Sequence, residues 1–155
     1  EFQVCPDRND KTYKNNGYQV PFLAKNKKGY QNLIKLSSIG FIEGFYYVPR
    51  IDKNIILEYS NDLIVTTGGL YGEIAQLILN EGEQKAEESL LWWKDNFKDD
   101  FYIEIVRHGL EEEEKVNEVL LRFAKKHSIK YFASNNTHYL NKDDARFFVL
   151  WCSTY

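Results

Sequence analysis

Residues 101–134 read FYIEIVRHGLEEEEKVNEVLLRFAKKHSIKYFAS, and this stretch indicates the class of fold. Phe101 to Val106 is a strand-like run, and Ile129 to Ala133 is a second one. Between them, apolar residues recur at the spacing of one helical face: Val116, Val119, Leu120, Phe123 and Ala124. Two strands joined by so long a helix lie parallel in one sheet, because parallel neighbours need a crossover connection. The stretch therefore predicts a parallel α/β arrangement.

The same alternation extends toward the amino end. We expect strands at 1–4, 18–24 and 63–66, helices at 26–40, 52–59, 72–80 and 83–96, and a last helix after Asn141. Asn26 and Asp52 stand before two of these helices, where a short polar side chain caps the unpaired N–H groups. No internal repeat or low-complexity linker interrupts the chain, so residues 1–155 are expected to form one domain.

Composition excludes several classes of protein. The 155 residues are 43% hydrophobic and 15% aromatic, which is enough apolar material for a core. The net charge of -3 has the wrong sign for a domain that binds nucleic acid directly through phosphate contacts. No apolar run approaches the ~20 residues of a membrane-spanning helix, so we expect a soluble, cytoplasmic protein without membrane contact.

Two further features concern the redox state and the limits of the chain. Cys5 and Cys152 are too few for a disulfide framework, so both are expected to be reduced thiols. The sequence contains no methionine and opens at Glu1 as though in the middle of a strand. We therefore expect it to be a piece of a larger protein.

In parallel α/β folds, functional groups gather where strands end and helices begin. Three segments occupy such positions: Thr67-Gly68-Gly69, Arg107-His108-Gly109 and Ser134 to Tyr139. His108 and His138 would then converge at one edge as ligands for zinc or manganese. The alternative is that each histidine is only a polar residue that closes a strand.

Other polar residues have simpler interpretations. Glu104 alternates with two isoleucines, so it points either toward a ligand inside a barrel or toward solvent. The run Glu111 to Glu114 falls in the first turn of a helix, where carboxylates are favourable without any catalytic role. Gly68, Gly69 and Gly72 follow a strand as in an anion site, but their spacing matches no phosphate-binding loop.

Seven short stretches spread over nearly the whole chain carry a family resemblance. They are LAKN (23–26) with GYQNL (29–33), GFYYVPRID (44–52), GEI (72–74), RHG (107–109), KVNE (115–118) and ASNNTHY (133–139). Together they resemble the polymerase and histidinol phosphatase (PHP) domain of bacterial DNA polymerase III alpha subunits. The resemblance implies part of a distorted (β/α) barrel of the PHP type that lacks its first strands.

The resemblance also implies a set of metal-ligand positions at the barrel rim. Active members hold a metal cluster there that hydrolyses phosphoester bonds, often as a proofreading exonuclease. Glu1, His108 and His138 match positions of the family's ligands.

Three other matching positions depart from the family's pattern. Gln19 stands where the family has histidine, Gly69 where it has cysteine or histidine, and Asn136 where it has aspartate. Without these donors a multi-metal cluster has too little negative charge and too few ligands. We therefore expect a degenerate metal site and no cofactor in this piece, with zinc or manganese only where the site of the longer parent chain is intact.

The function implied by the resemblance is that of a module within a replicative, DNA-directed DNA polymerase, a nucleotidyltransferase. We expect the module to be inactive by itself and either to support the polymerase region of the same chain or to dock a proofreading exonuclease subunit. The alternative is an active metal-dependent 3'-5' exonuclease or phosphoesterase. A free-standing PHP phosphatase is a third interpretation, and it fits less well because residues 44–52 look specific to the polymerase branch.

Overall fold

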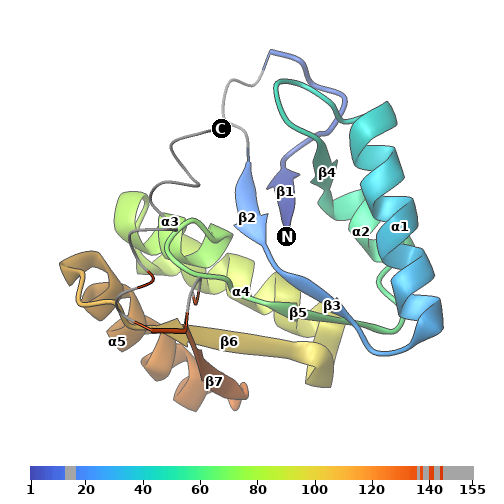
Figure 1. Ribbon diagram of the computed structural model, residues 1–155. Coiled ribbons are helices and arrows are strands. Elements are labelled where there is room, and N and C mark those ends of the chain that lie inside the picture. The colour runs from blue at the N-terminus through green and yellow to red at the C-terminus, as the bar shows by residue number, and fades with distance from the viewer. Residues whose placement is uncertain (13–16, 136, 138–139, 142–143, 145–155) are drawn as a thin grey trace.

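The computed structural model describes residues 1–12, 17–135, 137, 140, 141 and 144. Its elements are β1 (Phe2–Cys5), β2 (Tyr18–Val20), β3 (Phe22–Ala24), α1 (Lys27–Ile42), β4 (Arg50–Asp52), α2 (Lys53–Glu58), β5 (Leu63–Thr66), α3 (Glu73–Asn80), α4 (Glu83–Phe97), the 3₁₀ turn η1 (Lys98–Asp100), β6 (Phe101–Val106), α5 (Glu111–His127) and β7 (Tyr131–Ser134). The strands form one sheet in the order β2-β1-β4 and another in the order β3-β5-β6-β7 (Figure 1). The final helix expected after Asn141 and the thiol of Cys152 lie outside the described residues.

The sheets are mixed, which corrects the expectation of a parallel arrangement. β5, β6 and β7 run parallel to one another, as the sequence of residues 101–134 predicts, and β1 runs parallel to β4. However, β1 pairs antiparallel with β2, and β3 pairs antiparallel with β5. The chain between β1 and β2 contains no crossover helix in its described part, so it reverses direction and returns along β1.

Pro21 divides the single strand expected at 18–24 into two. Proline has no N–H to donate to a ladder, so the strand is interrupted there. β2 pairs with β1 before the proline, and β3 pairs with β5 after it. The Pro21 carbonyl still accepts a hydrogen bond from the Thr66 N–H at 3.2 Å. This segment therefore joins the two sheets.

Helix α1 confirms its predicted start and corrects its predicted end. The side chain of Asn26 accepts hydrogen bonds from the N–H groups of Lys28 and Gly29, which is the expected cap. The helix does not stop near Gly40 but continues to Ile42. A Cβ atom at position 40 would lie 3.4 Å from Ile51 Cγ2, so this glycine lets α1 approach β4 closely rather than ending the helix.

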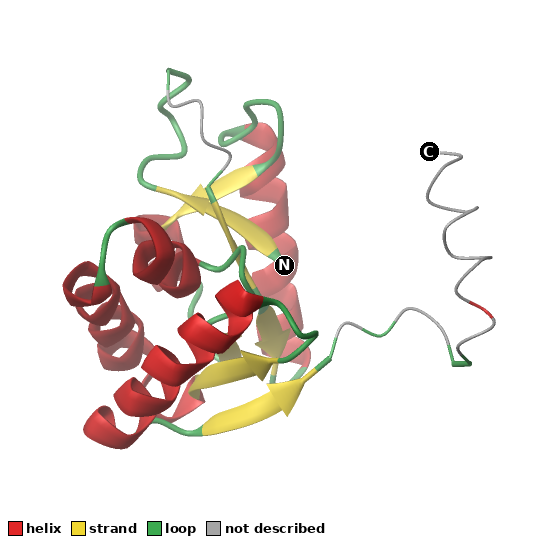
Figure 2. Cartoon of the chain, turned by 90° about the vertical axis from the view of Figure 1, so that its left-hand side faces the viewer, coloured by secondary structure: helices red, strands yellow, loops and turns green. Residues whose placement is uncertain are grey.

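The core is built where helices cover the sheets. α3, α4 and α5 pack together beside β6, whereas α1 and α2 lie against β4 (Figures 1 and 2). At the centre, the buried Trp93 of α4 packs edge-on against Phe22 of β3, with ring centroids 6.1 Å apart. In the part of the chain that the structure describes, no helix is long and apolar enough to cross a bilayer.

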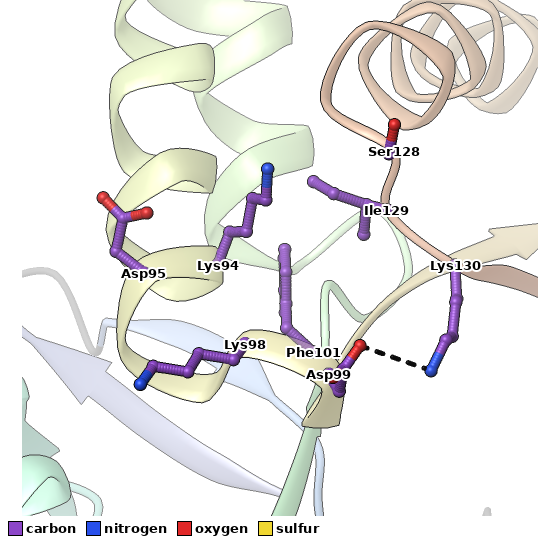
Figure 3. A pocket seen from close by; sticks show the side chains of 8 residues that line it. All are labelled: Lys94, Asp95, Lys98, Asp99, Phe101, Ser128, Ile129 and Lys130. Atoms are coloured by element: carbon purple, nitrogen blue, oxygen red, sulfur yellow. Dashed lines mark ion pairs between the residues drawn. The ribbon is translucent and has the colours of Figure 1, made fainter.

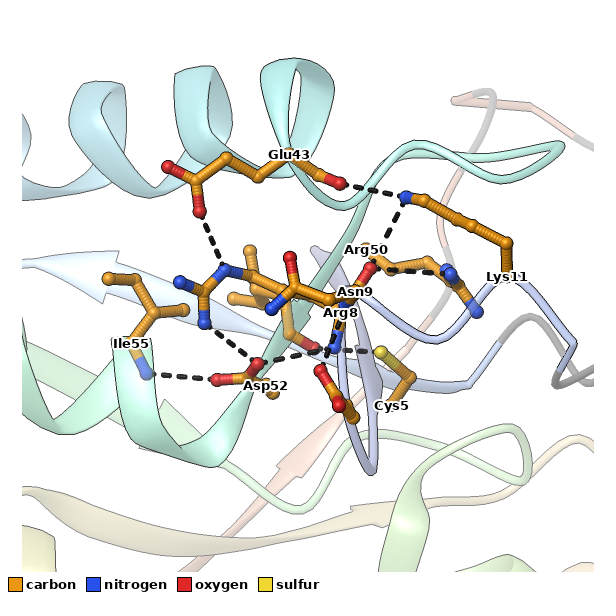
Figure 4. Close-up of polar contacts among 10 residues, drawn as sticks. Cys5, Arg8, Asn9, Lys11, Glu43, Arg50, Asp52 and Ile55 are labelled. Atoms are coloured by element: carbon orange, nitrogen blue, oxygen red, sulfur yellow. Dashed lines mark hydrogen bonds and ion pairs between the residues drawn. The ribbon is translucent and has the colours of Figure 1, made fainter.

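Strand β4 carries a buried cation and a buried anion that fasten two loops to the sheet (Figure 4). Arg50 is fully buried and donates hydrogen bonds to the carbonyls of Gly44, at 3.1 Å, and Asp10, at 2.8 Å. Asp52 accepts a hydrogen bond from the Arg8 guanidinium at 2.8 Å and caps α2 by accepting one from the Ile55 N–H. The loops before β2 and before β4 are therefore held by side chains of β4.

We predict that Asp52→Ala lowers the free energy of unfolding by about 2–4 kcal/mol, because it removes a helix cap and leaves Arg8 without its buried partner. Burial opposes the shift, but hydrogen bonds from Ile55 and Arg8 hold the pKa of Asp52 below its ordinary value of 3.8. The stabilisation is therefore present above that value and is lost as the pH falls through the lowered pKa. Denaturant unfolding from pH 7 to pH 3 measures both effects.

The matched control is Asp100→Ala, which removes the carboxylate of an exposed ion pair with Lys25. Exposed pairs contribute little, so its unfolding curve should stay close to that of the unchanged chain. Equal destabilisation by the two substitutions would contradict the role given to Asp52.

Candidate functional site

A cavity of about 690 Å³ lies at the ends of the parallel strands β5, β6 and β7. It is lined by Glu1, Gln19, Gly69, Leu70, Tyr71, Glu104, Val106, His108, Leu110, Glu113, Ser134 and Asn135. The lining includes residues from all three segments that the sequence placed at strand ends. Parallel pairing brings them together, because the carboxyl ends of neighbouring parallel strands share one edge.

The structure gathers four of the six positions singled out by the family resemblance. Glu1, Gln19, Gly69 and His108 all line this cavity, although they come from distant parts of the sequence. Asn136 and His138 lie outside the described residues. The assignment of Glu1, His108 and His138 as metal-ligand positions stays a prediction.

Glu104 projects into the cavity and is held there by hydroxyl groups. Its Oε2 accepts a hydrogen bond from Thr66 at 2.7 Å, and its Oε1 accepts one from Ser134 at 2.5 Å. Of the two orientations considered from the sequence, the structure places Glu104 on the cavity side. Both oxygens are engaged by neighbouring strands, so this carboxylate ties β5, β6 and β7 together at the cavity.

His108 and Glu113 form a second polar pair. The backbone N–H of His108 donates to Glu113 Oε2, and its ring Nδ1 lies 2.7 Å from Glu113 Oε1. The hydrogen bond to Glu113 raises the pKa of His108. Burial opposes the change in Glu113, but the contacts with His108 lower the pKa of that carboxyl. A protonated His108 and an ionised Glu113 therefore stabilise each other.

The partner of His108 is a residue whose role the sequence interpretation missed. Glu111, Glu112 and Glu114 are exposed in the first turn of α5, as the electrostatic interpretation of this run predicts. Glu113 is only 5% exposed and turns toward His108 instead. A sequence signal did exist, because Glu113 lies in the first turn of the helix that follows His108, close enough in sequence for its side chain to reach the His108 backbone.

The glycines after β5 serve the turn and the packing of α3. The N–H of Gly72 donates to the Gly69 carbonyl at 2.9 Å, which closes the turn. A Cβ at Gly72 would lie 2.1 Å from the Thr67 carbonyl oxygen, so no other residue fits without displacing the backbone. The close contact at position 72 explains that glycine without a bound anion.

The side chains that line the described part of the cavity differ in what they could offer a metal ion. Among the residues that the structure describes, no group of three or more His, Cys, Asp and Glu side chains could hold a metal ion. Gln19 contributes a neutral amide and Gly69 no side chain, and the oxygens of Glu104 already accept hydrogen bonds. Glu1 and His108 are the described residues that combine a cavity position with a match to the family's ligands.

A second cavity, of about 320 Å³, lies where β6 begins, between the ends of α4 and α5 (Figure 3). Its polar lining includes Lys94, which donates to the His127 carbonyl, and Lys130, which lies 3.5 Å from Asp99. Lysines near the carboxyl ends of helices are favourable for electrostatic reasons alone. None of the positions highlighted by the sequence lines this cavity, so the first cavity is the candidate site.

Comparisons with known proteins agree on one family. The model of the PHP domain matches residues 1–108. Over 128 residues the chain is 44% identical to the DNA polymerase III subunit alpha of Borreliella burgdorferi, and over 129 residues it is 45% identical to that of Thermus aquaticus. Each match covers 83% of this chain but 11% of the relative. The chain thus spans about a tenth of the length of these curated relatives.

We predict that Glu113→Gln returns the pKa of His108 toward its ordinary value of 6.5, because it removes the carboxylate that stabilises the protonated ring. In the unchanged chain the pair stabilises the fold between the lowered pKa of Glu113 and the raised pKa of His108, and this contribution is lost on either side. An NMR titration of the His108 ring measures the shift directly.

Glu114→Gln is the matched control, since it makes the same change at an exposed position of the same run. It should leave the titration of His108 nearly unchanged. A His108 titration that is identical in all three proteins would refute the pairing.

Proposed function

Because the chain belongs to the PHP domain family and is similar to DNA polymerase III alpha subunits over most of its length, we propose that it is the PHP domain of such a subunit. The parent chain would carry out DNA-directed DNA synthesis in chromosome replication, in the bacterial cytoplasm. Within it, this domain acts as a structural and interaction module rather than as a hydrolytic enzyme.

The replacement of metal donors around the cavity supports this proposal. Gln19 and Gly69 line the same cavity as Glu1 and His108, so the two departures from the family's pattern fall in the site itself. A hydrolytic cluster needs anionic or imidazole ligands that compensate its charge and hold an activated water. The neutral amide of Gln19 and the absent side chain of Gly69 supply neither an anionic nor an imidazole ligand. Asn136, at a position where the family has aspartate, would remove a further carboxylate.

We also propose that the two sheets are parts of one distorted barrel. Residues 18–24 already run from one sheet into the other through Pro21, and the Pro21 carbonyl pairs with β5. In this arrangement β4 and β7 are the edges that further strands of the parent chain would join.

An active metal-dependent exonuclease or phosphoesterase is the second candidate function. Its support is that Glu1 and His108 face one cavity that also contains Glu104 and Glu113. This alternative requires zinc or manganese held by these residues together with His138 or donors from elsewhere in the parent chain.

Metal content of the full-length parent chain separates the two proposals. We predict that elemental analysis finds zinc and manganese far below one ion per chain, both in the unchanged protein and in His108→Ala. Near-stoichiometric metal that is lost in His108→Ala would overturn the degenerate site and favour the exonuclease. Gln19→His serves as a complementary variant, because it restores an imidazole at a position where the family has one.

The scaffold role predicts what happens when residues 1–155 are deleted from the parent. We expect the remaining polymerase region to unfold at a lower temperature than the full chain, because it loses a large packed interface. We also expect the deleted chain to lose co-purification with its cognate proofreading exonuclease. A polymerase region of unchanged thermal stability would refute the scaffold role, and unchanged exonuclease binding would refute the docking role.

A further inference from the structure

Helix α1 is apolar on a side that nothing in the described structure covers. Gly29, Leu36 and Gly40 face the core, whereas Tyr30, Ile34 and Phe41 are 60%, 48% and 60% exposed. Tyr30, Ile34 and Phe41 are spaced by four and seven residues, so they share one stripe along the helix. We call this stripe, with the adjoining Ser38, the outer face of α1.

The outer face continues beyond the end of the helix. Phe41 stacks on Phe45, with ring centroids 6.4 Å apart, and Phe45 is itself half exposed. Ile42, at the last position of α1, is 82% exposed. An exposed cluster of large apolar side chains is typical of a surface that contacts other protein.

The charges on α1 indicate the chemistry of a partner that would cover its outer face. Residues 27–42 include Lys27, Lys28 and Lys35 but no Asp or Glu, although the whole chain has a net charge of -3. Lys27 and Lys28 lie in the first turn, where a positive charge is unfavourable to the helix. The helix with the exposed apolar stripe thus carries three lysines and no carboxylate, and the Lys35 ammonium lies 5.3 Å from the centroid of the Tyr59 ring. Carboxylates next to aliphatic or aromatic side chains would complement such a surface.

We propose that the outer face of α1 is a docking surface for an acidic, amphipathic segment of the same polypeptide that lies outside residues 1–155. This inference rests on the proposed function, because it takes the chain to be part of a polymerase subunit. The curated relatives are about nine times as long as the matched stretch, so most of such a chain is available to cover α1. A tethered segment binds at a high effective concentration, which favours it over a separate molecule.

A second copy of this chain is a poorer occupant. Two α1 helices that met through their outer faces would bring their lysines together with no carboxylate on either helix, and like charges across an interface are unfavourable. The charge pattern therefore selects a partner of different composition.

Zero-length carbodiimide cross-linking of the full-length parent, followed by mass spectrometry, tests this proposal. We expect Lys27, Lys28 or Lys35 to form amide links to Asp or Glu residues of the same polypeptide beyond this domain. Ile34→Glu should lower the yield of these links by roughly tenfold, because it places a carboxylate in an apolar contact. Leu121→Glu is the matched control, since Leu121 is 42% exposed on α5 and lies outside the outer face; it should leave the yield unchanged.

The thermal unfolding of the same proteins provides a second measurement. Ile34→Glu should unfold at a lower temperature than Leu121→Glu if the outer face is buried in the parent. Links between two copies, links only to another subunit, or equal yields and unfolding temperatures in the two variants would each overturn the proposal. If deletion of residues 1–155 destabilises the polymerase region but Ile34→Glu does not, the proposed function stands and this inference alone fails.

Discussion

The parallel pairing of β5, β6 and β7 is the constraint on which the rest of the structure depends. Parallel neighbours cannot be joined by a tight turn, so the chain between them crosses over, here through α3, α4 and α5, and these helices supply buried core side chains such as Trp93 and Leu120. The same pairing places the ends of β5, β6 and β7 at one edge. The cavity at that edge is a consequence of the topology rather than of any one residue.

The polar side chains of the cavity make hydrogen bonds within the fold, which leaves them less available for catalysis. Both carboxylate oxygens of Glu104 accept hydrogen bonds from hydroxyl groups of neighbouring strands. The carboxylate oxygens of Glu113 contact the backbone N–H and the ring of His108. Gln19 and Gly69, which line the same cavity, add a neutral amide and a residue without a side chain. The described polar groups of the cavity are therefore ordered by contacts within the fold.

Pro21 joins the amino-terminal part to this framework, and strand β4 holds the loops within that part. Pro21 redirects the chain from one sheet to the other without breaking the connection between them. Arg50 and Asp52, both buried on β4, bind loop carbonyls and a loop arginine. The outer side of α1, in contrast, leaves Tyr30, Ile34 and Phe41 exposed in the described structure.

The sequence by itself determined the local structure and the family. The caps at Asn26 and Asp52, the strand at Leu63–Thr66 and the run from Phe101 through α5 follow from short-range patterns, and so they were predictable. The location of Gly69 and His108 at one edge was also predictable, because it follows from parallel pairing. Only the tertiary structure decided that residues 18–24 serve two sheets, that Gly40 lies inside a helix, and that Glu113 turns inward. Each of these depends on a contact with a residue or strand whose position in space the local sequence does not specify.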